Sequence, residues 1–160
     1  MTSPDAKPTG ETPLDGDDLV VGVVCARWNA DIVDRLCGGA QAAAIESGAT
    51  PMIVSAPGAF ELPYAASVLA HSGDVDAIVV LGAVIRGETT HYEIVSQGCA
   101  SGVMKVQLDT GIPVGLGILT VEDHDQALAR SCDDHNVGRD ATLAAIEMAV
   151  LARTMLPAEN

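Results

Sequence analysis

Aromatic side chains are scarce in this sequence, which has one Trp, two Tyr and one Phe among 160 residues. A hydrophobic core without them must be built from Val, Ile, Leu and Ala, and these residues suit helices packed closely against a parallel sheet. At 160 residues and 48% hydrophobic content, the chain is long enough for one domain with a substantial core but short for two. Trp28, Phe60, Tyr64 and Tyr92 therefore stand out.

Basic residues are also few. The 8 Lys and Arg residues are outnumbered by 22 Asp and Glu residues, which gives a formal net charge of −14. Such a chain repels phosphate backbones and anionic membrane surfaces, so we expect neither nucleic acid nor a membrane among its partners. An anionic substrate would have to be bound by the few arginines near predicted loops, which are Arg86, Arg130 and Arg139.

The sequence lacks signatures of secretion, membrane insertion and metal binding. No apolar run approaches the roughly 20 residues of a membrane-spanning helix, and the N-terminal residues show no basic region followed by an apolar stretch. The four cysteines lack C-x-x-C spacing, so we expect a cytoplasmic protein with reduced thiols. His71, His124 and His135 lack metal-ligand spacing. We therefore expect structural or surface roles for them and assign no metal.

The chain divides into a polar tail and one domain. The composition of residues 1–18, rich in Pro, Gly, Thr and Asp, predicts a flexible N-terminal tail. Residues 19–160 form the predicted domain, in which strand and helix patterns alternate. The expected strands are residues 19–26, 52–56, 76–85 and 113–119, and the expected helices are residues 29–47, 60–71, 91–108, 122–130 and 140–156. This alternation predicts a flavodoxin-like three-layer α/β/α sandwich with a central, mainly parallel sheet.

The first strand is followed by the only Trp of the chain. Ligands of open parallel sheets bind at the carboxyl ends of the strands, so the loops there are candidate sites. Trp28 has two interpretations, either a lid on the core or a flat surface on which a planar heterocycle could stack. Asn29 is predicted to be the N-cap of the following helix.

The second strand is followed by PGAFELP, residues 57–63. The glycine permits close approach to the backbone, and the two prolines fix the loop. Glu61 lies near a helix start, where a carboxylate favours the helix dipole. The alternative is that it accepts hydrogen bonds from the hydroxyls of a sugar or polyol.

The third strand is followed by RGETTH, residues 86–91. Residues 87–90 precede a helix, so their N–H groups have no intrahelical acceptor and point outward, which favours an anion. His91 would lie beside that anion and could move protons near neutral pH; otherwise it is an ordinary surface or core histidine. Together, the three loops offer what a planar polar ring with a polyol and a phosphate would need.

In this order, the motifs resemble the 6,7-dimethyl-8-ribityllumazine synthases of riboflavin biosynthesis. The resemblance spans residues 19–156 and rests above all on PGAFELP followed by VIRGETTHY, with ARWN, GILTVE and AAIEM in support. It implies condensation of 5-amino-6-(D-ribitylamino)uracil with 3,4-dihydroxy-2-butanone 4-phosphate to give the lumazine, phosphate and water. The family uses no metal or organic cofactor, so none is expected here.

The resemblance also implies roles for particular residues. His91 would be the acid/base group of imine formation and phosphate elimination. Residues bound to the ribitylaminouracil would be Trp28, Asn29, Ala59, Phe60, Glu61, Ala83, Val84, Ile85 and Leu116. The butanone phosphate would be held by Glu88, Thr89 and Arg130.

A homo-oligomer is a further implication of the resemblance. Family members form pentamers with active sites at the subunit interfaces, and some pentamers assemble further into decamers or 60-subunit capsids. Leu116 stands where many members supply an aromatic residue from the neighbouring subunit. Val137 stands where a lysine is common, and Arg139 is expected to compensate for that charge. The product would pass to riboflavin synthase.

Three other functions are weighed against this one. An archaeal-type riboflavin synthase would share the fold, but it would need a second ring site instead of a phosphate cradle. A catalytically weak paralogue could bind lumazines or flavins, or form a cage. A flavodoxin-like electron carrier would share only the fold, and residues 27–30 lack the Ser/Thr-rich loop that binds its phosphate.

Overall fold

A four-stranded parallel sheet forms the centre of the protein in a computed structural model that describes residues 14–158. Its strand order is β2-β1-β3-β4. The strands are β1 (Val20–Ala26), β2 (Thr50–Ala56), β3 (Ala77–Ile85) and β4 (Val114–Val121). The two middle strands, β1 and β3, are nearly continuous apolar runs, as expected for strands that are covered on both faces.

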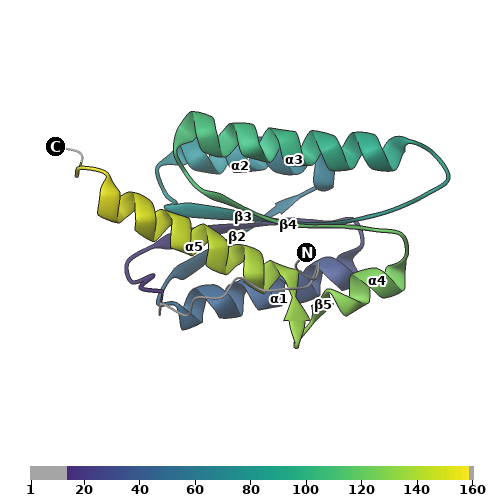
Figure 1. Cartoon of the computed structure of the whole chain (residues 1–160), viewed down its shortest axis with the longest axis horizontal. Helices are drawn as coiled ribbons and strands as arrows, with labels where there is room; N and C mark the ends of the chain where they lie inside the picture. The colour runs from purple at the N-terminus through teal and green to yellow at the C-terminus, as the bar shows by residue number, and fades with distance from the viewer. Residues whose placement is uncertain (1–13, 159–160) are drawn as a thin grey trace, which may run out of the picture.

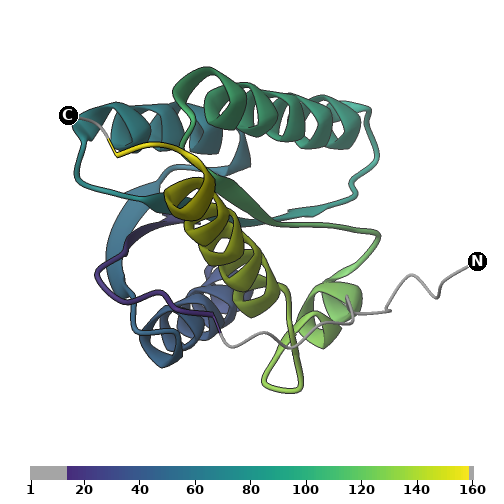
Figure 2. The same cartoon turned by 60° about the vertical axis from the view of Figure 1, so that its left-hand side comes forward.

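Helices cover both faces of the sheet (Figures 1 and 2). One face carries α1 (Ala30–Glu46) and α5 (Val137–Met155), which pack against each other, and the other carries α2 (Leu62–Ser72) and α3 (His91–Thr110). The short α4 (His124–Ala129) follows β4. This arrangement confirms the predicted three-layer sandwich. Within residues 14–158, none of the helices combines the length and the hydropathy that a membrane crossing requires.

The sheet separates two hydrophobic clusters, because successive side chains of a strand point to opposite faces. Val79 of β3 packs on the side of α1 and α5 with Leu36 and Ile146, all fully buried. Its neighbour Val80 packs on the side of α2 and α3 with Leu62. Both layers are therefore fixed by aliphatic side chains, in agreement with the scarcity of aromatic residues.

Three features differ from the sequence prediction. A hairpin of β5 (Ser131–Cys132) and β6 (His135–Asn136) separates α4 from α5. The last helix begins at Val137, three residues earlier than predicted, because the Asn136 side chain caps it by accepting a hydrogen bond from the Arg139 N–H at 3.0 Å. Ala59–Glu61 also form a 3-10 turn, η1, ahead of α2.

The segment just before β1 packs against the domain. Leu14 contacts the hydrophobic cluster, and the Gly16 N–H donates to the Ser47 carbonyl at 2.8 Å. The Arg153 guanidinium donates to the carbonyl oxygens of Asp15 and Asp17, at 2.9 and 3.1 Å. The packed chain thus begins before Leu19, where the tail was expected to end. Residues 1–13 of that expected tail lie outside the described residues.

Candidate active site

The candidate site lies along the edge where the parallel strands end. The β3–α3 and β4–α4 loops leave this edge at the right of Figure 1. From β1 the chain continues to β2, at one edge of the sheet, and from β3 it continues to β4, at the opposite edge. The order in which the strands are added therefore reverses between β1 and β3. Such a switch point is where open α/β sheets bind ligands.

Asn29 bridges the two strands at this switch point. Its Nδ2 donates to the Ala83 carbonyl of β3 at 2.9 Å. Its backbone is left-handed, with φ 57° and ψ 50°, a conformation that Asn adopts more readily than most residues. Asn29 is the N-cap residue of α1, as predicted, and its backbone carbonyl accepts from the N–H groups of Ile32 and Val33 at 3.0 Å, but its side chain makes no capping hydrogen bond and is used across the sheet instead.

Trp28, in the loop after β1, and Glu61, in the loop after β2, both lie close to Gly58. A Cβ added to Gly58 would lie 3.0 Å from Trp28 Cδ1 and 3.3 Å from Glu61 Oε2. The indole is 74% exposed, so it does not close the core, and its ring is accessible to a planar group. A flat ring and a carboxylate are thus presented side by side.

The turn η1 gives the remaining residues of this loop different surroundings. Ala59 is buried, whereas Phe60 is exposed and reaches over α3. A Cβ added to Gly98 of α3 would lie 3.2 Å from the Phe60 ring. The Glu61 N–H donates to the Gly58 carbonyl at 3.2 Å, which fixes the turn.

The end of β3 offers backbone groups next to these side chains. Ala83 is buried, and Val84 and Ile85 are half-buried. All three pair with β4, whereas the pairing of β1 with β3 stops at Leu81. On the β1 side, residues 83–85 therefore have a backbone edge that no strand covers, and Asn29 occupies only the Ala83 carbonyl.

The loop of residues 87–90 forms an exposed approach to α3. The His91 N–H donates to Thr89 Oγ1 at 3.3 Å, and within the described chain the N–H groups of Gly87 and Glu88 donate to no protein acceptor. The 20-residue helix behind them places its positive end here. The exposed His91 imidazole lies at the same helix start. This arrangement suits an anion beside a proton-transfer group.

The three arginines near these loops have different partners. Arg139 donates to Glu46 of α1 at 2.5 Å, so the expected compensation for the lysine replaced by Val137 finds no support. Arg86 is bound by two carboxylates, a role that sequence reasoning missed because the partners lie 7 and 36 residues away. Arg130, half-buried at the end of α4, donates to the Gln126 carbonyl at 3.0 Å.

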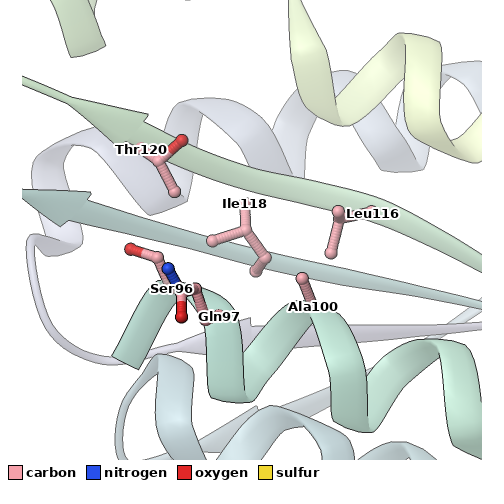
Figure 3. A pocket seen from close by; sticks show the side chains of 6 residues that line it. All are labelled: Ser96, Gln97, Ala100, Leu116, Ile118 and Thr120. Atoms are coloured by element: carbon pink, nitrogen blue, oxygen red, sulfur yellow. The ribbon is translucent and has the colours of Figure 1, made fainter. Parts of the chain in front are cut away.

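Leu116 lies apart from the strand ends, in the middle of β4. It pairs with Val80 and is 47% exposed, because β4 is an outer strand of the sheet. Its side chain lines a groove of about 250 Å³ between β4 and α3 (Figure 3), together with Ser96, Gln97, Ala100, Ile118 and Thr120. Leu116 is therefore separate from the loops that follow β1, β2 and β3, which carry Trp28, Glu61 and His91, and Arg130 lies at the end of α4.

The histidines outside the site have structural partners or surface positions. His124 Nε2 lies 2.6 Å from Asp31 Oδ2, and this hydrogen bond lowers the pKa of the Asp31 carboxyl. His71 Nδ1 lies 2.8 Å from the Ser67 carbonyl. Among residues 14–158, no group of three His, Cys, Asp or Glu side chains is placed to hold a metal ion.

Comparison with known proteins identifies relatives over nearly the whole chain. The family model for 6,7-dimethyl-8-ribityllumazine synthase matches residues 18–153. A curated protein of that name from Nitrosospira multiformis is 45% identical over 148 residues, covering 91% of this chain and 91% of the relative. Relatives of the same name come from Kineococcus radiotolerans, 44% identical over 92% of this chain and 93% of the relative, and Saccharopolyspora erythraea, 42% identical over 99% and 96%.

Proposed function

The chain belongs to the 6,7-dimethyl-8-ribityllumazine synthase family, and we propose that it forms its product at the carboxyl edge of β1, β2 and β3. It is a transferase that condenses 5-amino-6-(D-ribitylamino)uracil with 3,4-dihydroxy-2-butanone 4-phosphate in riboflavin biosynthesis. One observation carries the assignment of the site. An exposed indole, a carboxylate and a helix start with a histidine come from three separate segments and lie along one edge of the sheet.

The ribitylaminouracil occupies the β1 and β2 side of the site. Its pyrimidine stacks on Trp28, whose exposed face is large and loses little entropy on binding. The uncovered backbone of residues 83–85 hydrogen-bonds the edge of the pyrimidine. Glu61 accepts hydrogen bonds from the ribityl hydroxyls, and Ala59 and Phe60 line the path of that chain.

The butanone phosphate occupies the β3 and β4 side. Its phosphate accepts hydrogen bonds from the N–H groups at Glu88 and Thr89 and from the Thr89 hydroxyl, at the positive end of α3. Arg130 supplies the counter-charge. Arg86 does not serve this purpose, because Glu93 and Glu122 neutralise its guanidinium.

His91 moves the protons of the reaction. Attack of the pyrimidine amine on the butanone carbonyl gives an imine and releases water, and elimination of phosphate then requires removal of a proton from carbon. An imidazole at the start of α3 can accept that proton and return it, a contribution of roughly 10²- to 10⁴-fold in rate. Much of the remaining acceleration comes from holding the two substrates together.

The complete site requires a neighbouring subunit in this proposal. Leu116 lies on an outer strand, in a largely apolar groove that is accessible from outside. Further exposed apolar side chains lie on α3 and β2, namely Ile94, Met104, Leu108, Met52 and Ile53. A homopentamer would cover such surfaces and would bring Leu116 to the pyrimidine site of the adjacent subunit. The product passes to riboflavin synthase in the cytoplasm.

The test is an absorbance assay of lumazine formation from the two substrates. The wild type is expected to form product, and inorganic phosphate should compete with the butanone phosphate. Thr89→Ala and Arg130→Ala should raise KM for the butanone phosphate, with KM for the pyrimidine little changed. Lys105→Ala, which removes an exposed ion pair on α3, is the control. Absence of product from an assembled protein would contradict the reaction, and effects confined to the pyrimidine would contradict the phosphate assignment.

A further inference from the structure

Arg86 joins three elements at the edge of the proposed site. Its backbone N–H donates at 2.9 Å to the carbonyl of Val121, the last residue of β4. Its Nε lies 3.0 Å from a carboxylate oxygen of Glu122, and its Nη1 pairs with Glu93 in the first turn of α3. The guanidinium carbon lies 4.1 Å from the centroid of the Tyr92 ring, so the planar group also stacks on an aromatic face.

These contacts join the two ends of the loop that carries His91 and the N–H groups proposed to bind the phosphate. Arg86 precedes residues 87–91, and Tyr92 and Glu93 follow them, so the side-chain bridge joins the two ends of the exposed loop. A loop whose ends are held at a fixed separation has fewer conformations to lose when a ligand binds. The bridge therefore preorganises the N–H groups of the helix start.

The same arginine is connected to α4. Glu122, bound to Arg86, donates its backbone N–H to Gln126 Oε1 at 2.9 Å. The backbone carbonyl of Gln126 in turn accepts a hydrogen bond from Arg130 Nη1 at 3.0 Å. A continuous series of contacts thus runs from the 87–91 loop through Arg86, Glu122 and Gln126 to Arg130.

We propose that Arg86 is a positioning residue, which fixes the 87–91 loop against the end of β4 and the first turn of α3 and so sets the geometry of phosphate binding without contacting the phosphate. This inference rests on the proposed function of the site. Two carboxylates offset the charge of the guanidinium, so Arg86 contributes little net attraction for an anion of its own. Arginine is suited to this position because its planar fork can bond two acceptors and stack on Tyr92, which a lysine ammonium cannot do together.

The first experiment measures binding of inorganic phosphate to the assembled full-length protein by calorimetry. Arg86→Ala should weaken binding roughly 10-fold, and Arg86→Lys should recover only part of the loss, because small misplacements of binding groups are costly. In the synthase assay, the same variants should raise KM for the butanone phosphate and leave KM for the pyrimidine within about twofold. The control Lys105→Ala removes an ion pair elsewhere on α3 and should match the wild type.

A double-mutant cycle with Glu93→Gln separates positioning from direct contact. If Arg86 positions the loop, Glu93→Gln weakens phosphate binding in the wild-type background. In the Arg86→Ala background, Glu93→Gln does not weaken phosphate binding, because there is no guanidinium left for Glu93 to hold. The substitution then removes only a negative charge. If Arg86 contacted the phosphate directly, Glu93→Gln would free its charge and tighten binding in the wild-type background, which would overturn the proposal.

Other outcomes are equally decisive. Failure of the wild type to bind phosphate, or an equal rise in both KM values together with a lower melting temperature in Arg86→Ala and Arg86→Lys, would also overturn the positioning role. Failure of the proposed function has a different signature, since a wild type that makes no lumazine can still give the predicted phosphate-binding cycle.

Discussion

The side chain of Asn29 donates to the carbonyl of Ala83 at 2.9 Å, across the gap between the ends of β1 and β3. The two strands are parallel neighbours, but the chain continues from β1 to β2 and from β3 to β4, on opposite sides of the pair. The pairing of β1 with β3 stops at Leu81. This bond joins the loop that carries Trp28 to the uncovered backbone of residues 83–85. It links the stacking surface to the groups that are proposed to bind the edge of the same ring.

Two substitutions at Asn29 should separate its bond from its backbone conformation. Asn29→Gly keeps the left-handed backbone and loses the hydrogen bond, and we expect a free energy of unfolding about 1 kcal/mol lower. Asn29→Ala adds the strain of a side chain in that conformation, about 1 kcal/mol more. Both should raise KM for the pyrimidine several-fold. Chemical denaturation and steady-state kinetics measure these effects. Wild-type values for both variants would show that the hydrogen bond from Asn29 to Ala83 does not have this role.

The exposed ring of Trp28 should supply much of the affinity for the pyrimidine. Trp28→Ala should weaken binding of the ribitylaminouracil by about 1 to 3 kcal/mol, the usual contribution of aromatic burial and stacking. Trp28→Phe should keep part of it. Calorimetric titration of the assembled protein measures the change, and an unaltered affinity in Trp28→Ala would refute stacking.

Adjacent glycines of α1 should respond in opposite directions to substitution by alanine. A Cβ at Gly39 would lie 2.3 Å from Oδ1 of the buried Asn136, which caps α5, so Gly39→Ala should destabilise the fold by about 1 to 3 kcal/mol. A Cβ at Gly38 would meet nothing within 4 Å, and Gly38→Ala should stabilise the helix by up to about 1 kcal/mol. Urea unfolding of both variants provides the comparison. Equal effects would show that α1 and α5 do not approach as described.

The thiol of Cys37 should be more acidic than the neighbouring thiol of Cys25. A hydrogen bond with the Cys25 thiol lowers the pKa of Cys37 to about 7, and the same bond, with burial, raises the pKa of Cys25. Since only the thiolate reacts, alkylation of Cys37 by iodoacetamide should rise as the pH increases through about 7. Cys25→Ala removes the donor, so labelling of Cys37 should then require a higher pH.

Peptide mapping by mass spectrometry distinguishes the thiols in this experiment. Cys99 is an internal control, because burial raises its pKa to about 11 and it should stay unlabelled at neutral pH. Labelling of Cys25 ahead of Cys37 would contradict the predicted direction of the hydrogen bond.

Much of the fold could be predicted from local pattern. The apolar runs of β1 and β3 and the glycines after α2 and α3 mark their elements clearly, and parallel strands necessarily bring the following loops to one edge. The β5–β6 hairpin could not be predicted, since its strands are two residues long and carry no periodic pattern. The packing of residues 14–18 depends on Arg153, at the other end of the chain.

The residues of the candidate site can be proposed from the sequence, whereas their contacts cannot. Motif and position along the chain identify Trp28, Glu61 and His91, whereas local rules assign Asn29 to the cap of α1. Asn29 does occupy that position, but the partner of its side chain lies 54 residues away, which no local rule predicts. The network around Arg86 likewise depends on Glu122 of the next loop, and no local rule predicts such a pairing.

The central claim is that lumazine forms beside His91, and the most direct measurement compares wild type with His91→Ala in the absorbance assay. The account predicts that the variant assembles normally, keeps KM for both substrates within a few-fold and loses roughly 10²- to 10⁴-fold in kcat. Lys105→Ala should match the wild type. An unchanged kcat in an assembled His91→Ala variant would contradict the account and would place proton transfer elsewhere.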